Sequence, residues 1–252
     1  MTESAIQPAE AAPTLSQMQR VTNTFTAPSK TFEDIKRGNR SWWMPFLISI
    51  VFAYILFAAI TVKITWSQVA ENTISMNQKS AERMAQLPPE QRANAMKFTQ
   101  YLTEGIFVAS PVLVILVALV ISGVMLGTIN FIFGGKAKFA DVFAVWFYAS
   151  LPGLIKTILA TIVIFSGMAP ESFNIQNFAP TNVGAFLSQQ DVGAAVYRLA
   201  TAIDFTTIWY LVLFGIGISV VAGVKRSAGY IAVFGWWVLL TLIGVGYAAV
   251  AG

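Results

Sequence analysis

The 252-residue chain is 56% hydrophobic and only 11% charged, against about one quarter charged in an average soluble domain, so most of it must face lipid or other apolar helices. It contains no cysteine and no histidine, which excludes a disulfide framework, thiolate chemistry and the commonest general base and metal ligand. Its net charge of +4 lies on residues that flank apolar segments, so membrane orientation explains that charge and no nucleic-acid partner is expected.

The amino-terminal segment is polar. Residues 1–27 lack the basic start and the apolar core of a signal peptide, and we expect a disordered cytosolic tail. A short amphipathic helix is predicted from residue 28. Its apolar face holds Phe32 and Ile35, and the basic residues around it include Lys36, Arg37 and Arg40. A basic flank that only sets topology is the favoured interpretation of this helix; the alternative is that it lies on an anionic membrane surface.

Five apolar segments have roughly the 20 residues that a bilayer requires. The predicted spans are about 42–62, 106–133, 142–165, 204–224 and 229–251. Residues 67–104 are polar and helix-prone and are interrupted at Pro88-Pro89, which predicts a helical hairpin between spans one and two. We therefore expect an all-α polytopic membrane protein, with a five-helix membrane domain over residues 28–252.

The short turns between spans predict the orientation. Lys136 and Lys138 follow span two, and Lys225 and Arg226 follow span four. Short loops rich in Lys and Arg remain on the cytosolic side. The amino terminus is then cytosolic, whereas the hairpin and the carboxyl terminus are extracytoplasmic.

Two ionisable residues, Lys156 and Asp204, lie within or at the edge of predicted spans. Such residues are rare in membranes and often mark a functional site. If spans three and four pack together, the two side chains can meet. Structural roles are favoured nevertheless: Lys156 can extend its amine to the interface, and Asp204 can occupy the third helical position behind an N-capping Thr201.

Small residues recur at four-residue spacing in two spans. Gly123 and Gly127 do so in span two, and Gly215, Ser219 and Gly223 do so in span four. Such ridges allow helices in lipid to approach closely. Packing within the chain is the expected use, and oligomerisation is the alternative.

The sequence disfavours an enzyme. A serine protease needs a base beside its nucleophile, and a paired-aspartate protease needs two acids at membrane depth, whereas only Asp204 is near. No glycine-rich phosphate loop with a Lys-Ser/Thr ending occurs. No cofactor or metal is expected.

Four motifs in order resemble the Yip family of Ypt/Rab-interacting membrane proteins, in its bacterial branch. They are Pro28 to Phe32; Gly134-Gly135-Lys-Ala-Lys-Phe; Ile203-Asp204-Phe205-Thr-Thr-Ile-Trp209; and Val224-Lys-Arg226. The resemblance implies a compact five-helix membrane domain with a cytosolic amino terminus. The eukaryotic branch carries an acidic Asp-Leu-x-Gly-Pro type motif before the first span, where this chain has Arg40-Ser-Trp-Trp-Met-Pro45. A Rab-type GTPase partner is therefore not expected.

These observations favour a non-enzymatic scaffold or accessory protein of the bacterial inner membrane. It would bind another membrane protein, for example a transporter, or a second copy of itself. The hairpin motivates this hypothesis, because a protein that only crossed the membrane would not need about 40 ordered residues outside it. The alternatives are a small solute or ion transporter using Lys156 and Asp204, and a lipid-binding, membrane-shaping protein using the basic amphipathic helix.

Overall fold

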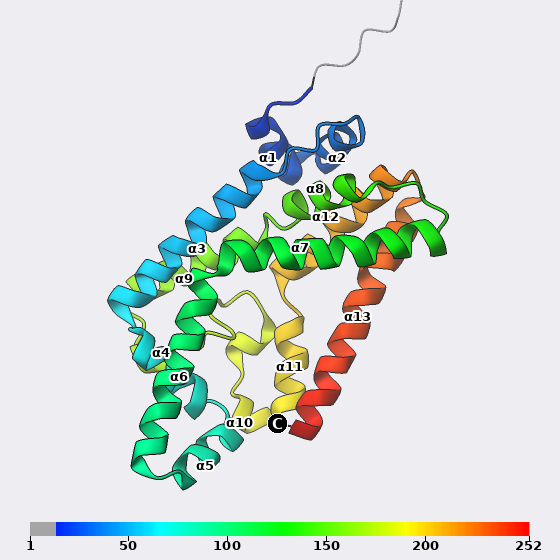
Figure 1. Ribbon diagram of the computed structural model, residues 1–252. Helices are drawn as coiled ribbons and strands as arrows, with labels where there is room; N and C mark the ends of the chain where they lie inside the picture. Colours follow the sequence, from blue (N-terminus) through cyan, green and yellow to red (C-terminus); the bar gives the residue numbers. More distant parts are fainter. Residues whose placement is uncertain (1–13, 252) are drawn as a thin grey trace, which may run out of the picture.

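The computed structural model describes residues 14–251, and helices dominate this part of the chain (Figure 1). In order, the elements are α1 (Gln17–Thr26), α2 (Pro28–Lys36), α3 (Trp43–Lys63), α4 (Trp66–Ser75), α5 (Gln78–Gln86), α6 (Pro89–Val108), α7 (Ser110–Gly127), the π-helical turn η1 (Thr128–Ile132), α8 (Phe139–Ala149), α9 (Gly153–Phe165), the 3-10 turns η2 (Pro170–Ser172) and η3 (Val183–Phe186), α10 (Gln189–Val192), α11 (Ala194–Ala202), α12 (Phe205–Ala222) and α13 (Arg226–Ala251).

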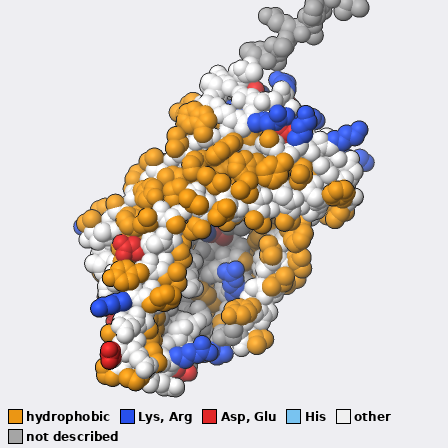
Figure 2. All heavy atoms as spheres, viewed as in Figure 1, with side chains coloured by type: hydrophobic (Ala, Val, Ile, Leu, Met, Phe, Trp, Pro, Cys, Tyr) orange, Lys and Arg blue, Asp and Glu red, His pale blue; other side chains and the backbone are white. Residues whose placement is uncertain are grey.

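Five stretches are long and apolar enough to cross a membrane, which confirms the predicted all-α, multi-pass membrane fold. They are Trp43–Lys63, Ser110–Ile132, Phe139–Phe165, Phe205–Ala222 and Arg226–Val250. Figure 2 shows a continuous band of apolar side chains over the part of the surface that α3 and α7 form. Such a band is too extensive for a surface in water and suits contact with lipid.

Two buried helices, α8 and α12, form the centre of the molecule. Every side chain of α8 from Asp141 to Ala149 is buried, and α12 packs against α2, α8 and α13. In Figure 1, α1 and α2 lie above these helices, α7 crosses below them, and α3 and α13 diverge toward the bottom of the view. The main apolar core therefore lies between the amino-terminal helices and α7.

The third span consists of two helices. α8 ends at Ala149 and α9 begins at Gly153, with Pro152 in the turn between them. Proline has no N–H to donate and its ring obstructs a continuing helix. The Gly153 N–H donates instead to the Ser150 carbonyl at 2.9 Å, which closes a tight turn. The break allows α8 to stay in the core while α9 packs along α3.

The segment between the first two spans is a helical hairpin, as predicted. α4 packs along α6, with α5 between them in sequence, and α6 begins with Pro89 in its first turn. α6 ends at Val108, and α7 leaves it at a clear bend in Figure 1. Pro111, in the first turn of α7, explains the bend because it cannot donate an i to i−4 hydrogen bond.

A second apolar cluster fixes the hairpin to the rest of the chain. Trp66 of α4 stacks near Phe57 of α3 and Phe107 of α6, with ring centroids 5.1 and 5.4 Å away. The buried Asn72 amide donates to the Phe173 carbonyl at 2.9 Å and so connects α4 to the loop after α9. The base of the hairpin is therefore held by both apolar and polar contacts.

Two expectations about the amino terminus are wrong. Residues 17–26 form α1 rather than a disordered tail, with a capping box between Ser16 and Gln19; residues 1–13 of the predicted tail lie outside the described part of the chain. Phe32 and Ile35 are 0% exposed and belong to the main core, so they are not available to a membrane surface. The apolar face of α2 covers α12 instead of lipid.

Candidate functional site at the head of the fourth span

Asp204 caps the amino-terminal end of α12. Its Oδ1 atom accepts hydrogen bonds from the Thr207 N–H at 2.9 Å and the Thr206 hydroxyl at 2.6 Å. Its Oδ2 atom accepts from the Thr181 hydroxyl at 2.6 Å and lies 3.1 Å from the Lys156 Nζ atom. The Asp204 side chain is 1% exposed and that of Lys156 is 29% exposed. The two ionisable residues singled out in the sequence therefore form a pair.

The cap is Asp204 itself rather than Thr201. Asp204 has the extended backbone of an N-cap, and a carboxylate there also interacts favourably with the helix dipole. Thr201 lies inside the separate helix α11, and its hydroxyl donates to the Arg198 carbonyl at 2.9 Å. The expected position was wrong because α11 ends two residues before Asp204 and α12 starts afresh.

The same region anchors the long loop that follows α9. Asp204 and Asn182 form an isolated antiparallel bridge, and the Phe205 N–H donates to the Thr181 carbonyl at 3.0 Å. The Asn182 amide donates to the Asn177 side-chain oxygen at 2.6 Å. The start of α12, the loop and Lys156 of α9 are thus one hydrogen-bonded unit.

This geometry limits the chemistry available to Asp204. Each carboxylate oxygen has two partners, which uses the roughly four acceptor positions of an ionised carboxyl group. A carboxylate stabilised in this way is a poor proton acceptor. Within residues 14–251, no three His, Cys, Asp or Glu side chains gather as a metal site would require. The pair is best suited to joining spans three and four.

A cavity of about 270 Å³ lies beside Lys156. Ser150, Trp146 and Tyr210 also line it. The Trp146 Nε1 atom is buried without a hydrogen-bond partner in the described chain. The cavity is therefore polar on one side, although it lies next to the core.

The turn after span two packs against the end of span four. Gly134 has a φ of 68°, which favours glycine, and the Lys136 N–H donates to the Ala222 carbonyl at 3.0 Å. A Cβ on Gly135 would lie 2.9 Å from the Ala222 Cβ atom, so only glycine fits without a shift. Gly223 ends α12 in the left-handed conformation at φ 69°. The motif that begins at Gly134 and the motif that begins at Val224 are distant in the sequence, but the segments that carry them are neighbours in the fold.

One aromatic residue of the third motif, Trp209, faces the amino-terminal helices. Phe205 and Trp209 lie one helical turn apart, with ring centroids 5.5 Å apart. Trp209 also meets Phe25 of α1 edge-on at 5.6 Å. This motif therefore contributes to the contact between α12 and the amino-terminal layer.

The two small-residue ridges have different surroundings. A Cβ on Gly215 would lie 2.5 Å from the Tyr230 ring, and one on Gly229 would lie 3.0 Å from the Ser219 Cβ, so this ridge packs α12 against α13. A Cβ on Gly123 or Gly127 would meet nothing within 4 Å. The ridge on α7 has no partner within the described chain.

A buried polar network around Arg20 was not predicted. The Arg20 guanidinium donates to the carbonyls of Asn39 and Ser41, lies 3.8 Å from the Asp34 carboxylate, and is 0% exposed. Burial lowers its pKa from the ordinary value, although Tyr148, whose ring lies 4.8 Å away, and Asp34 raise it. The network fastens α1 and α2 to α8.

Sequence signals for this network existed. Ser16 and Gln19 have capping-box spacing just before Arg20, which indicates a helix within a segment that otherwise looks disordered.

The basic residues predicted to lie on the membrane surface differ in their contacts. Arg40 pairs with the buried Asp141, whereas Lys36 and Arg37 remain exposed.

The comparisons with known proteins identify one family. The Yip1 domain family model matches residues 22–248, which include the end of α1, the first four candidate spans and nearly all of the fifth. The chain matches no curated protein and no solved structure.

Proposed function

The chain belongs to the Yip1 domain family, and on that basis we propose that it is a non-enzymatic accessory or scaffold protein that binds another membrane protein. We infer that it lies in the bacterial inner membrane with a cytosolic amino terminus, as the basic turns between spans predict. The observation that carries the proposal is an uncovered apolar face on α6, the arm of the hairpin that leads into span two.

This α6 face is formed by Phe98, Tyr101 and Leu102, which are 67%, 68% and 52% exposed. Spacings of three and four residues put all three on one side of the helix. The side that packs on α4 includes Phe107, whose ring centroid lies 5.4 Å from that of Trp66. Aromatic residues that stay exposed on an anchored helix are typical of the centre of a protein interface.

The open glycine ridge on α7 supports a second contact with the same partner. Gly123 and Gly127 lie on one face of α7, and no described residue occupies the space above them. A partner helix can approach such a ridge closely in lipid. A partner that reaches both the α6 face and this ridge would contact the protein outside and inside the membrane.

The test is recovery of partners from native membranes with a Phe98→Glu variant. A buried charge at an interface costs several kcal/mol, so the variant is expected to lose its co-purifying membrane protein. Gln86→Glu is the matched control, because it adds the same charge to an exposed position on α5. The control is expected to retain the partner.

Removal of residues 70–100 gives a stronger version of the same test. If this deletion, in a protein that still inserts, leaves every co-purifying protein in place, the proposed function is wrong. If Gln86→Glu and Phe98→Glu lose the partner equally, the α6 face is not the contact.

A further inference from the structure

We propose that the protein carries a binding site for an anionic amphiphile, with a basic cavity for its charged headgroup and an adjoining apolar cavity for its hydrocarbon part. The site lies between α5, α11 and α13, away from the Lys156–Asp204 pair and from the α6 face. It goes beyond the accessory role and does not depend on it.

The basic cavity has a volume of about 360 Å³, which is within the range of small-ligand sites. Three cationic side chains line it: Lys79 and Arg83 of α5, and Arg198 of α11. The described residues that line it include no Asp or Glu. Figure 2 shows Lys and Arg side chains around a hollow below α7.

These three cations face a cavity whose described wall holds no acidic side chain, and Lys79 also donates to the Val250 carbonyl at 3.4 Å. Within residues 14–251, none of them takes part in an ion pair of 4.0 Å or less. Lys79 and Arg83 lie four residues apart on one helical face, an arrangement in which like charges repel each other. Arg198 adds a third positive charge from a distant part of the sequence. A bound anion would remove this repulsion.

The surroundings are suited to an anion. Asn77 caps α5 with its side-chain oxygen, and Ser80 follows in the first turn; both line the cavity. The helix therefore directs its positive dipole end toward this space. Arg198 lies over α13, where a Cβ on Gly244 would come 3.2 Å from its Nε atom. Glycine at this position makes room for the guanidinium.

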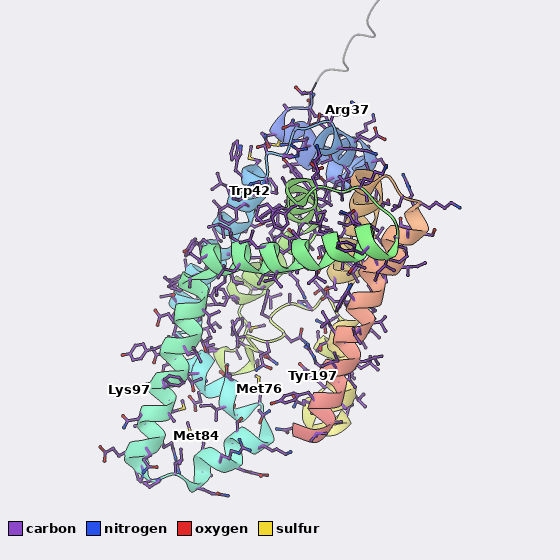
Figure 3. All side chains as sticks on the ribbon, turned by 45° about the vertical axis from the view of Figure 1, so that its right-hand side comes forward. Arg37, Trp42, Met76, Met84, Lys97 and Tyr197 are labelled. Atoms are coloured by element: carbon purple, nitrogen blue, oxygen red, sulfur yellow. The ribbon has the colours of Figure 1, made fainter. Side chains whose placement is uncertain are left out.

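A second cavity, of about 430 Å³, adjoins the first. The two share Asn177, Gln189 and Tyr197 in their walls. Its wall contains the apolar side chains of Met76, Val163, Met168, Phe178 and Leu187, together with polar ones that include Ser172, Asn174, Ser188 and Gln190. Figure 3 shows Tyr197 and Met76 in the space between the hairpin and α13.

The two cavities together favour an amphiphile over a free anion. A phosphate group would fit the three cations and would accept hydrogen bonds from guanidinium and amide donors. An acyl chain would fit the apolar cavity. Anionic phospholipids have both parts, and a chain that spans a membrane is always in contact with them.

The experiment measures lipid binding by the full-length protein in detergent, by native mass spectrometry. Phosphatidylglycerol is expected to bind, and phosphatidylcholine with the same acyl chains is not. Arg83→Gln and Arg198→Gln are each expected to raise the Kd for phosphatidylglycerol about tenfold, because each removes hydrogen bonds to a charged group. Arg198→Lys keeps the charge and is expected to keep most of the affinity.

Lys97→Gln is the matched control, because it removes one charge from an exposed position on α6 outside both cavities. It is expected to leave the Kd unchanged. Equal binding of the two lipids, or equal effects of Lys97→Gln and Arg198→Gln, would overturn the proposal. Glycerol 3-phosphate provides the last comparison: if it binds as tightly as the lipid, the apolar cavity has no role and an amphiphile is the wrong ligand.

Discussion

The Lys156 Nζ atom lies 3.1 Å from the Asp204 Oδ2 atom, so a charge pair joins the third span to the start of the fourth. Asn caps helices as well as Asp does, so Asp204→Asn retains the cap and removes the pair. We expect the free energy of unfolding to fall by about 1.5–3 kcal/mol, the usual contribution of a hydrogen bond to a charged group. Thermal unfolding in detergent measures the change.

The double variant Lys156→Met with Asp204→Asn checks the cause. An apolar side chain in place of an unpaired charge should recover most of the lost stability. Asp191→Asn, at an exposed position, should change little. If Asp204→Asn leaves stability unaltered but abolishes partner binding or transport in a normally inserted protein, the role assigned to the pair is wrong.

The neighbouring acids of α2 give a second prediction. Asp34 is 2% exposed and faces the buried Arg20, so Asp34→Asn should destabilise the protein by about 3–5 kcal/mol by leaving a buried charge unpaired. Glu33 is 52% exposed and pairs with Arg37 at 3.9 Å, so Glu33→Gln should cost about 0–1 kcal/mol. Limited proteolysis of the first 41 residues should distinguish the two variants, and equal cleavage rates would contradict the buried network.

Two glycines with different surroundings give a third prediction. A Cβ on Gly229 would lie 2.3 Å from the Gly215 carbonyl oxygen, which is backbone and cannot turn aside. Gly229→Ala should therefore cost about 1–3 kcal/mol through overpacking. Gly123→Ala meets nothing within 4 Å and should be neutral or stabilise the helix by about 0.5–1 kcal/mol. Melting temperatures that fall equally in both variants would show that the ridge on α7 is also packed.

A substitution at Phe32 tests whether α2 serves the protein core or a membrane surface. Its side chain is fully buried, so Phe32→Ala should lower the free energy of unfolding by about 3–5 kcal/mol. Met18→Ala, at a position 60% exposed, should have little effect. A stable Phe32→Ala protein that binds anionic liposomes more weakly than the parent would restore the surface role that the sequence suggested.

Much of the architecture could be predicted because hydropathy and helix-breaking residues are local signals. The five candidate spans follow from runs of apolar residues, and the hairpin follows from a polar segment divided at Pro88-Pro89. The break at Pro152 leaves α8 in the core while α9 packs along α3. This arrangement depends on contacts between segments that are distant in the sequence.

The site was predictable only in part. Lys156 and Asp204 attract attention because charges are rare in apolar helices, yet the partners Thr181 and Asn182 come from a loop without regular structure. The amino-terminal helices were misjudged for a related reason. The apolar face of α2 fits lipid and protein equally well, and only the packing of α12 decides between them: a Cβ added at Gly217 would lie 3.2 Å from the Phe32 ring.

The packing of α2 on α12 has a consequence for the synthesis of the chain. Phe32 is synthesised long before Gly217, the α12 residue against which it packs. Until the fourth span has been made, α2 lacks its main packing partner, although α1 and α8 can already contact it. The amino-terminal layer therefore completes its packing only after the fourth span has been synthesised.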